Sequence, residues 1–249
     1  MNLEICNLTC TYYNKKTKEV TTALSNVDIV FPLKKITALI GKIGSGKTTL
    51  LKIIGGILPY DSGELLYDSI DLDRVYVEDR NFSYIDQNPI LYPKKTVFDN
   101  LALPLLQLKM KKEEIRETIY KISREYKIDY LLTRKPKELS IGQIQMINFV
   151  KAQLKKPELY LLDEPFSNLD LKTNLKIRKK LKDVINDTNS TCIIATHNIN
   201  DVLYLADYVV VLDEGKVVAQ GSVDEIFHSK DKLVYALMHA EEQNNENKQ

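Results

Sequence analysis

Eight residues, 41–48, constrain the fold of this chain more than any other segment. They read Gly-Lys-Ile-Gly-Ser-Gly-Lys-Thr and match the pattern G-x-x-x-x-G-K-[ST]. An apolar run precedes them at residues 36–40, and a helical pattern follows at residues 49–58. A strand, a glycine-rich turn and a helix in this order surround an anion with backbone N–H groups at the positive end of a helix dipole. The segment therefore predicts a phosphate-binding loop within an α/β fold.

The composition of this loop favours a bound nucleotide over a turn that holds nothing. The chain has only 9 glycines, and three of them lie in this loop. Lys47 is placed to reach the β- and γ-phosphates, and the Thr48 hydroxyl to ligate Mg²⁺. The expected nucleotide-binding residues here are Gly41, Gly44, Ser45, Gly46, Lys47, Thr48 and Thr49.

An acidic pair, Asp163 and Glu164, follows the apolar run at residues 159–162. An acid at the carboxyl end of a buried parallel strand faces the crevice in which α/β sheets bind ligands. Asp163 is expected to hold Mg²⁺ through water, and Glu164 to polarise an attacking water molecule. Two acids here would also be explained structurally, because acidic side chains interact favourably with the positive end of the next helix's dipole. Their occurrence together with the phosphate-binding loop favours the functional interpretation.

The pattern of apolar runs predicts how the rest of the chain is organised. Buried strands are expected at residues 36–40, 159–162, 191–195 and 208–212. These runs do not alternate with polar residues, which is typical of a parallel sheet covered on both faces. Residues 1–35 carry polar interruptions and predict antiparallel strands. Between about residues 90 and 155 the strand signal disappears, and residues 111–126 predict an amphipathic helix. We expect one domain, residues 1–249, with a helical lobe at about 90–155 and a polar tail at about 241–249.

Charge and cysteine content exclude several classes of protein. There are 35 Lys and Arg against 34 Asp and Glu, and the net charge of +1 argues against a nucleic-acid partner. No stretch approaches the ~18 consecutive apolar residues of a membrane span. The first residues carry no basic segment followed by an apolar one, so we expect no secretory signal. Cys6, Cys10 and Cys192 lack metal-ligand spacing and are expected to be reduced, buried thiols.

Further short motifs follow the phosphate-binding loop in a fixed order. They are Gln87 within Ser83-Tyr84-Ile85-Asp86-Gln87, then Leu139-Ser140-Ile141-Gly142-Gln143, the run 159–164, Ser167-Asn168-Leu169-Asp170, and His197 within Ala195-Thr196-His197. With the loop, they resemble the nucleotide-binding subunit of an ATP-binding cassette (ABC) transporter over about residues 3–228. The resemblance implies a P-loop NTPase fold of ABC type, with a mostly parallel sheet, an N-terminal antiparallel β subdomain and an inserted helical lobe.

The resemblance also implies roles for single residues. Tyr12, with Tyr13 as the alternative, would stack on adenine. Lys47, Glu164 and His197 would be catalytic, with His197 contacting the γ-phosphate and orienting the attacking water. The implied metal ligands are Thr48, Gln87 and Asp163, and Gln87 would couple the metal site to a membrane partner. Further nucleotide contacts are implied for Gln87, Ser140, Gly142, Gln143 and Asp170.

Partners and cofactors follow from the same resemblance. Two such subunits would face each other head to tail and sandwich two ATP molecules, each between the phosphate-binding loop of one subunit and residues 139–143 of the other. Asp170 would cross the interface and steady the opposite loop. Membrane-spanning transporter subunits would convert opening and closing into transport. ATP and Mg²⁺ are the expected cofactors, and the chain is expected at the cytoplasmic face of the cell membrane.

Residues 139–143 depart from the family pattern Leu-Ser-Gly-Gly-Gln, because the third residue is Ile141. Met146 also stands where a basic residue is usual. Ser140 and Gln143 have the spacing of a capping box, which would explain both structurally and is compatible with phosphate binding. A β-branched residue in place of glycine adds a Cβ and a branch that would hold the backbone away from an anion. We therefore expect a weakened signature half, either within a pair of identical subunits or within an asymmetric heterodimer.

Several stretches are similar to maltose-type sugar importers and related solute importers. They are residues 90–93, 96–100, 134–140 and 163–170. The extra C-terminal domain of about a hundred residues in those importers is not expected here. A bacterial importer of a sugar or another small solute is thus the main prediction. A soluble ABC ATPase, as in iron–sulfur cluster assembly, and a subunit that holds ATP without turnover remain alternatives. An apolar groove around Gln87, Leu91, Tyr92, Val97, Phe98 and Leu101 would favour a transporter, because it would receive a helix of the membrane subunit. The alternative place for these apolar residues is the core of the helical lobe, and some of them are expected there.

Overall fold

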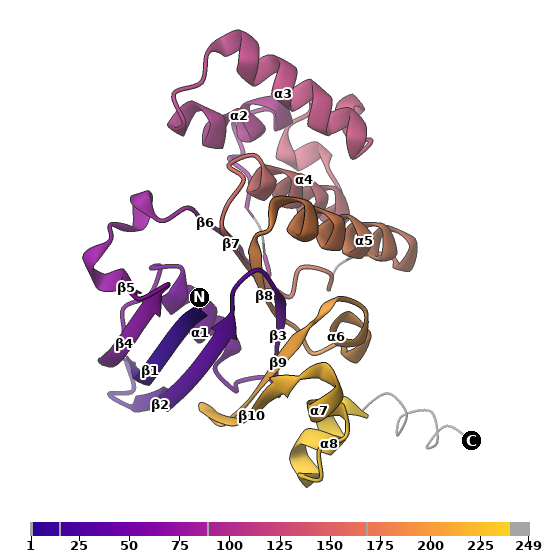
Figure 1. Cartoon of the computed structure of the whole chain (residues 1–249). Coiled ribbons are helices and arrows are strands. Elements are labelled where there is room, and N and C mark those ends of the chain that lie inside the picture. Colours follow the sequence, from indigo (N-terminus) through magenta and orange to yellow (C-terminus); the bar gives the residue numbers. More distant parts are fainter. Residues whose placement is uncertain (1, 15, 89, 168, 240–249) are drawn as a thin grey trace.

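Two β-sheets organise the chain, seen in a computed structural model that describes residues 2–14, 16–88, 90–167 and 169–239 (Figure 1). The expected tail at about 241–249 and Asn168 lie outside these residues. The strands are β1 Asn2–Tyr13, β2 Val20–Pro32, β3 Ile36–Ile40, β4 Ser62–Tyr67, β5 Ile70–Asp71, β6 Phe82–Ile85, β7 Leu159–Asp163, β8 Thr191–Ala195, β9 Tyr208–Asp213 and β10 Lys216–Ser222. All four apolar runs predicted as strands are therefore confirmed.

The two sheets differ in strand direction, as the sequence predicts. The smaller sheet, in the order β2-β1-β4-β5, is antiparallel throughout. The larger sheet has the order β10-β9-β3-β8-β7-β6, in which neighbours from β9 to β6 run parallel and only β10 is antiparallel. The predicted fold class, a mostly parallel core with an N-terminal antiparallel subdomain, is confirmed.

Helices cover both faces of the larger sheet. The helices are α1 Lys47–Ile54, α2 Val97–Gln107, α3 Lys112–Glu125, α4 Ile141–Gln153, α5 Leu171–Thr188, α6 Ile199–Leu205, α7 Val223–Phe227 and α8 Lys232–Met238. Alternate residues of β7 belong to different cores: Leu159 and Leu161 pack in the core that contains α1, whereas Tyr160 and Leu162 pack in the core that contains α4 and α5. Burial on both faces explains why these strands read as unbroken apolar runs.

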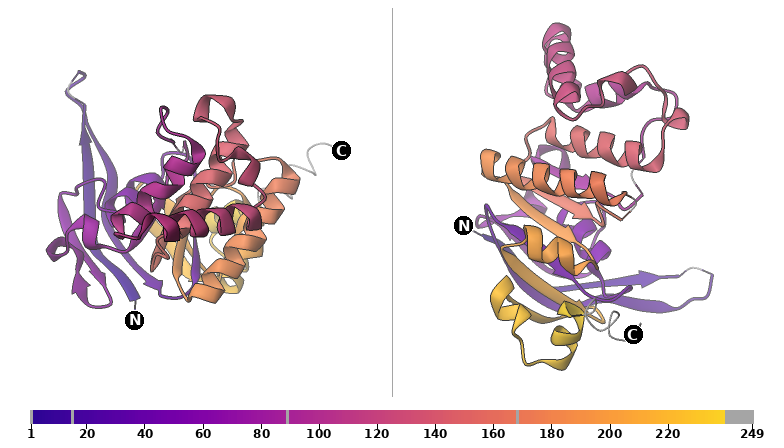
Figure 2. Two further views of the ribbon diagram at one scale, coloured as in Figure 1. Left: turned by 90° about the horizontal axis from the view of Figure 1, so that it is seen from above. Right: turned by 90° about the vertical axis from the view of Figure 1, so that its right-hand side faces the viewer.

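The three helices of residues 97–153 project from one end of the sheet (Figure 2). In Figure 1, α2 and α3 lie at the opposite end of the molecule from α7 and α8. The α3 pattern holds as predicted, since Ile115 and Ile119 are buried. Cys10 and Cys192 are buried, and Cys6 is only half-buried.

The helix after the phosphate-binding loop is shorter than predicted. It ends at Ile54 rather than at residue 58, because Gly56 adopts a φ of 69°. The N–H groups of Ile57 and Leu58 both donate to the carbonyl oxygen of Lys52, at 2.8 and 3.2 Å. A glycine with positive φ is the usual end of a helix, and it turns the chain toward β4 here.

Candidate functional site

The phosphate-binding loop joins β3 to α1 and needs glycine at two of its positions. Gly41 has a φ of 153°, and a Cβ atom added there would meet the carbonyl oxygen of Leu212 at 2.1 Å. Gly46 has a φ of 102°, and its Cβ would meet the carbonyl oxygen of Ala23 at 2.7 Å. Both contacts are with backbone, which cannot turn aside as a flexible side chain could. The loop is therefore packed tightly between β2 and β9, and its amides are fixed in place.

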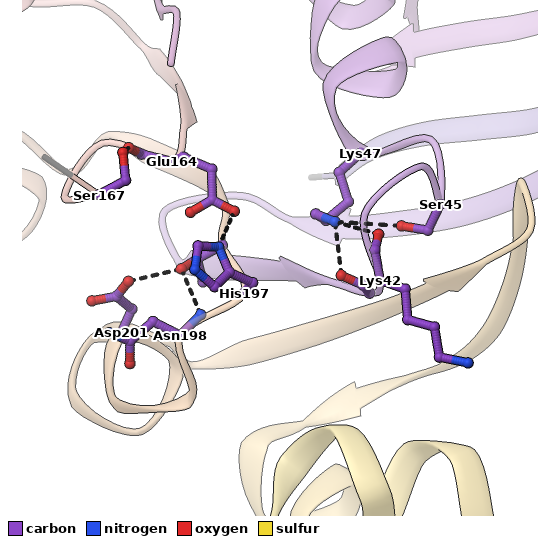
Figure 3. A network of polar contacts seen from close by, with 10 residues as sticks. Lys42, Ser45, Lys47, Glu164, Ser167, His197, Asn198 and Asp201 are labelled. Carbon is purple, nitrogen blue, oxygen red and sulfur yellow. Dashed lines mark hydrogen bonds and ion pairs between the residues drawn. The ribbon is translucent and has the colours of Figure 1, made fainter. Parts of the chain in front are cut away.

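The ammonium group of Lys47 lies inside this loop (Figure 3). Its Nζ donates to the carbonyl oxygens of Gly41 and Lys42 at 2.8 and 2.9 Å. Burial lowers the pKa of Lys47, while the carboxylates of Glu164 and Asp163 raise it. A cation fixed at the centre of a loop of backbone amides is positioned to bind the phosphates of a nucleotide.

Asp163, the last residue of β7, is buried beside the start of α1. The Tyr84 hydroxyl donates to its carboxylate at 3.5 Å, and the Thr48 hydroxyl lies close to it. Burial raises the pKa of Asp163 although both hydroxyls lower it, and the nearby Asp86 raises it further. A threonine hydroxyl and a carboxylate side by side are oxygen donors of the kind that Mg²⁺ takes from proteins, alongside water and phosphate. The sequence reasoning missed Tyr84, which only the pairing of β6 with β7 brings to Asp163.

Glu164 and His197 form a hydrogen-bonded pair at the carboxyl ends of β7 and β8 (Figure 3). His197 Nδ1 lies 2.7 Å from Glu164 Oε1. Glu164 has a φ of 47°, and its N–H donates to the carbonyl oxygen of Ala195 at 2.9 Å. Burial raises the pKa of Glu164, and the hydrogen bond from His197 lowers it. A carboxylate with a raised pKa, oriented by an imidazole, is suited to accept a proton from water.

Tyr12 lies beside this site, at the end of β1. Its hydroxyl is 3.1 Å from Thr49 Oγ1 in the first turn of α1. Tyr12 is 42% exposed, so part of its surface is accessible to a ligand next to the phosphate-binding loop. The alternative Tyr13 is 60% exposed. The structure thus brings Tyr12, the loop, Asp163, Glu164 and His197 together.

A second group of expected site residues lies elsewhere, around the N-terminus of α4. Ser140 caps α4: the Gln143 N–H donates to Ser140 Oγ at 3.3 Å, and the Ser140 N–H donates to Gln143 Oε1 at 3.0 Å. Ile141 is the first residue of the helix and is 66% exposed. Ser140, Gly142 and Gln143 line a cavity of about 700 Å³ together with Asp170, which caps α5 by accepting the Thr173 N–H at 3.0 Å.

The groove predicted near Gln87 exists with a different lining. A cavity of about 810 Å³ lies between β6 and the helices α2 and α4. Leu91, Val97 and Leu101 do not line it, because they are buried in the core of the helical lobe. Phe98 packs partly buried against the same core. Gln87 is exposed two residues after β6. Leu91, Val97, Leu101 and Phe98 thus follow the alternative expectation, a place in the core of the helical lobe.

The observed lining of this groove contains both exposed apolar side chains and lysines. The exposed apolar side chains are Ile57, Ile90, Tyr92 and Leu106. Lys151 Nζ lies 5.8 Å from the centre of the Tyr92 ring, and burial lowers the pKa of Lys151. Lys52 pairs with Asp86 at 3.6 Å.

Among the residues that the structure describes, none of the helices combines the length and the apolar character of a membrane span. The same residues contain no group of three or more His, Cys, Asp or Glu side chains that could hold a metal ion.

Comparisons with known proteins place the chain among ATP-binding proteins. The family model described as "ABC transporter" matches residues 24–167. The molybdate/tungstate import ATP-binding protein WtpC of Pyrococcus horikoshii is 41% identical over 189 residues, which cover 76% of this chain and 55% of that protein. The glucose import ATP-binding protein GlcV of Saccharolobus solfataricus is 37% identical, over 86% of this chain and 61% of that protein. The chain therefore spans little more than half the length of these relatives.

Solved structures agree with the sequence relatives. A dimeric, post-hydrolysis state of the ATP-binding cassette MJ0796 bound to ADP and Pi superimposes with a TM-score of 0.81 at 27% identity, covering 89% of this chain and 98% of that one. The structure of an ATP-binding subunit of an ABC transporter matches with a TM-score of 0.78 at 26% identity, covering 100% of both chains.

Proposed function

The chain belongs to the ABC transporter family, and from this membership we propose that it binds and hydrolyses ATP to power solute transport by membrane-spanning partner subunits. One observation carries the proposal more than any other: the Glu164–His197 pair, 2.7 Å apart, lies on the strand ends that adjoin a phosphate-binding loop. Binding alone would need the loop, but it would not need a buried carboxylate held by an imidazole. The arrangement therefore favours hydrolysis over simple retention of ATP.

In the proposed mechanism, the loop amides and Lys47 bind the β- and γ-phosphates of ATP. Thr48 and Asp163 would hold Mg²⁺, because they present a hydroxyl and a carboxylate together at the first turn of α1. The metal ion supplies charge neutralisation on the phosphate oxygens. Tyr12 would stack on the adenine, since it lies beside the first turn of α1, where its hydroxyl contacts Thr49.

Glu164 is proposed to orient the attacking water molecule and accept its proton. The raised pKa of Glu164 makes it a better base than an exposed glutamate, provided that it is deprotonated. His197 would keep the carboxylate in one orientation through Nδ1 and present its exposed edge to the γ-phosphate. Lys47, Glu164 and His197 thus each have a chemical role, and no additional acid or base is needed.

The cavity beside α4 is proposed to belong to a composite site with a second ABC subunit. Ser140 leaves the N-terminus of α4 exposed and capped, so its amides can approach an anion held by a partner. The exposed Ile141 is proposed to weaken this half of the site. Hydrolysis by purified Ile141→Gly should therefore exceed that of the unaltered chain. Equal rates would show that Ile141 does not impair the signature.

The groove lined by Tyr92 and Lys151 is proposed as the docking site of the membrane subunit. Its exposed apolar side chains fit the apolar face of a short helix, and the half-buried Lys151 fits a carboxylate on that helix. The relatives named above as import ATP-binding proteins support an importer of a small solute, with the chain peripheral at the cytoplasmic face of the membrane.

Affinity purification from membranes tests this docking. The tagged chain should recover membrane proteins. Tyr92→Asp should abolish this recovery, because it places a charge among the exposed apolar side chains of the groove. Tyr76→Asp is the matched control, because Tyr76 is also exposed but lies outside the groove. Recovery of soluble proteins only would favour the alternative of an ABC ATPase without a membrane partner. Equal loss in both variants would contradict the assignment of the groove.

A further inference from the structure

A buried charged pair lies behind the Glu164–His197 pair and contacts none of the phosphate-binding residues. Arg178 of α5 and Asp201 of α6 form an ion pair, with side chains that are 7% and 5% exposed. Desolvating two charges costs free energy that can exceed the attraction between them, so stability alone explains such a pair poorly. Its surroundings suggest another purpose.

The pair reaches the segment that carries His197. Asp201 Oδ2 accepts a hydrogen bond from Thr196 Oγ1 at 2.7 Å, and Thr196 directly precedes His197 (Figure 3). The same hydroxyl oxygen accepts the N–H of Asn198 at 3.1 Å, and the Thr196 N–H donates to the carbonyl oxygen of Leu39 at 3.1 Å. The residues on both sides of His197 are thereby fixed through one threonine side chain.

Arg178 also reaches the segment that carries Glu164. Its guanidinium lies 5.7 Å from the centre of the buried Phe166 ring, two residues after Glu164. One turn earlier in α5, the Asn174 amide lies 3.5 Å from the carbonyl oxygen of Phe166. The carbonyl oxygen of Glu164 accepts the hydroxyl of Ser167 at 3.0 Å. The loop after β7 is thus fixed by contacts of α5 with Phe166 and by the hydrogen bond between Ser167 and Glu164 within the loop.

These contacts close a ring. It runs from Arg178 through Asp201 and Thr196 to His197, across the 2.7 Å contact to Glu164, and back through Phe166 to Arg178. We infer that Arg178, Asp201 and Thr196 are positioning residues that hold His197 and Glu164 in the orientation needed to act together. None of the three touches the reacting atoms, and the inference rests on the proposed ATPase function only for its kinetic consequence.

Two variants distinguish a positioning role of these residues from a contribution to folding alone. Thr196→Val keeps the shape of the side chain and the Arg178–Asp201 pair, but it removes the hydroxyl that joins the pair to the His197 segment. The double change Arg178→Met with Asp201→Leu replaces both charges by apolar groups of similar size, which is tolerated far better than removing one charge. Lys182→Met is the matched control, because Lys182 lies on the same helix and donates to the carbonyl oxygen of Tyr204 of α6 at 3.1 Å.

The first readout does not require activity. In side-chain ¹⁵N NMR spectra, the chain should give signals from His197, His228 and His239, and the last two serve as internal controls because each Nδ1 is 3.0 Å from a backbone carbonyl oxygen. The His197 Nδ1 resonance should move in Thr196→Val and in the double variant, while the signals of His228 and His239 stay in place. An unchanged His197 resonance in both variants would overturn the inference, whether or not the chain hydrolyses ATP.

The second readout is steady-state ATP hydrolysis. A displacement of about 1 Å at a catalytic group can lower a rate about 100-fold. We therefore expect kcat to fall about 10-fold in Thr196→Val and 10- to 100-fold in the double variant, with KM for ATP changed less than about 2-fold and Lys182→Met unaffected. An unchanged kcat with a raised KM, or an equal loss of kcat in Lys182→Met, would contradict a positioning role. Absence of hydrolysis by the unaltered chain would refute the proposed function and leave the NMR result to decide this inference.

Discussion

Gly41 offers a quantitative test of how tightly the phosphate-binding loop is packed. A methyl group at this position would lie 2.1 Å from the carbonyl oxygen of Leu212 and 2.6 Å from Ser45 Oγ. The φ of 153° adds strain for any other residue, about 1–2 kcal/mol. Overpacking against backbone adds about 1–3 kcal/mol. Gly41→Ala should therefore lower the free energy of unfolding by about 2–5 kcal/mol.

Gly44 in the same loop is the matched control. Its φ is 84°, but a Cβ atom there would meet nothing within 4 Å. Gly44→Ala should cost only the backbone strain, about 1–2 kcal/mol. Urea unfolding of the two variants and the unaltered chain measures both values, and binding of a fluorescent ATP analogue reports the loop geometry. Gly41→Ala should be the less stable variant and bind the analogue more weakly. Equal stability of the two variants would refute the close packing of the loop against β9.

Three further outcomes are expected. Tyr12→Ala should weaken ATP binding about 5- to 30-fold by loss of stacking worth about 1–2 kcal/mol, as judged by titration calorimetry, whereas Tyr12→Phe should bind normally because only the contact with Thr49 is lost. Because burial raises the pKa of Glu164 and the base must be deprotonated, kcat at saturating ATP and Mg²⁺ should fall as the pH drops, with an apparent pKa above the 4.5 of an ordinary glutamate. A rate that stays constant down to pH 4.5, with the chain still folded, would contradict this assignment. Ile141→Asp should hydrolyse ATP more slowly than the unaltered chain, since it places a negative charge where an anion is proposed to bind. An unchanged rate would argue against this surface as part of the site.

Features set by neighbouring residues could be predicted from the sequence. The strand Ile36–Ile40 and the loop that follows are local, because the spacing of the glycines and Lys47 itself encodes the backbone conformation. The order of the later motifs also predicted that Asp163, Glu164 and His197 lie at the ends of strands. No long-range contact was needed for these inferences.

Features set by packing could not be predicted. An apolar residue can cover a core or line a groove, and the sequence left both placements open for Leu91, Val97 and Leu101, which the structure places in the core of the helical lobe. The Arg178–Asp201 pair joins two helices whose contact depends on the whole sheet, and nothing in the sequence marks either residue. Charge pairs between separate helices are the part of a site that a single sequence reveals least.

Glu164→Gln tests the central claim most directly. The substitution keeps the size of the side chain and removes its negative charge, so the loop, Lys47 and Tyr12 should still bind ATP. ATP hydrolysis by the purified variant should fall by at least 100-fold relative to the unaltered chain, with Kd for ATP changed less than about 3-fold, as expected for loss of a proton acceptor. Hydrolysis at the rate of the unaltered chain, with ATP bound equally well, would contradict the account.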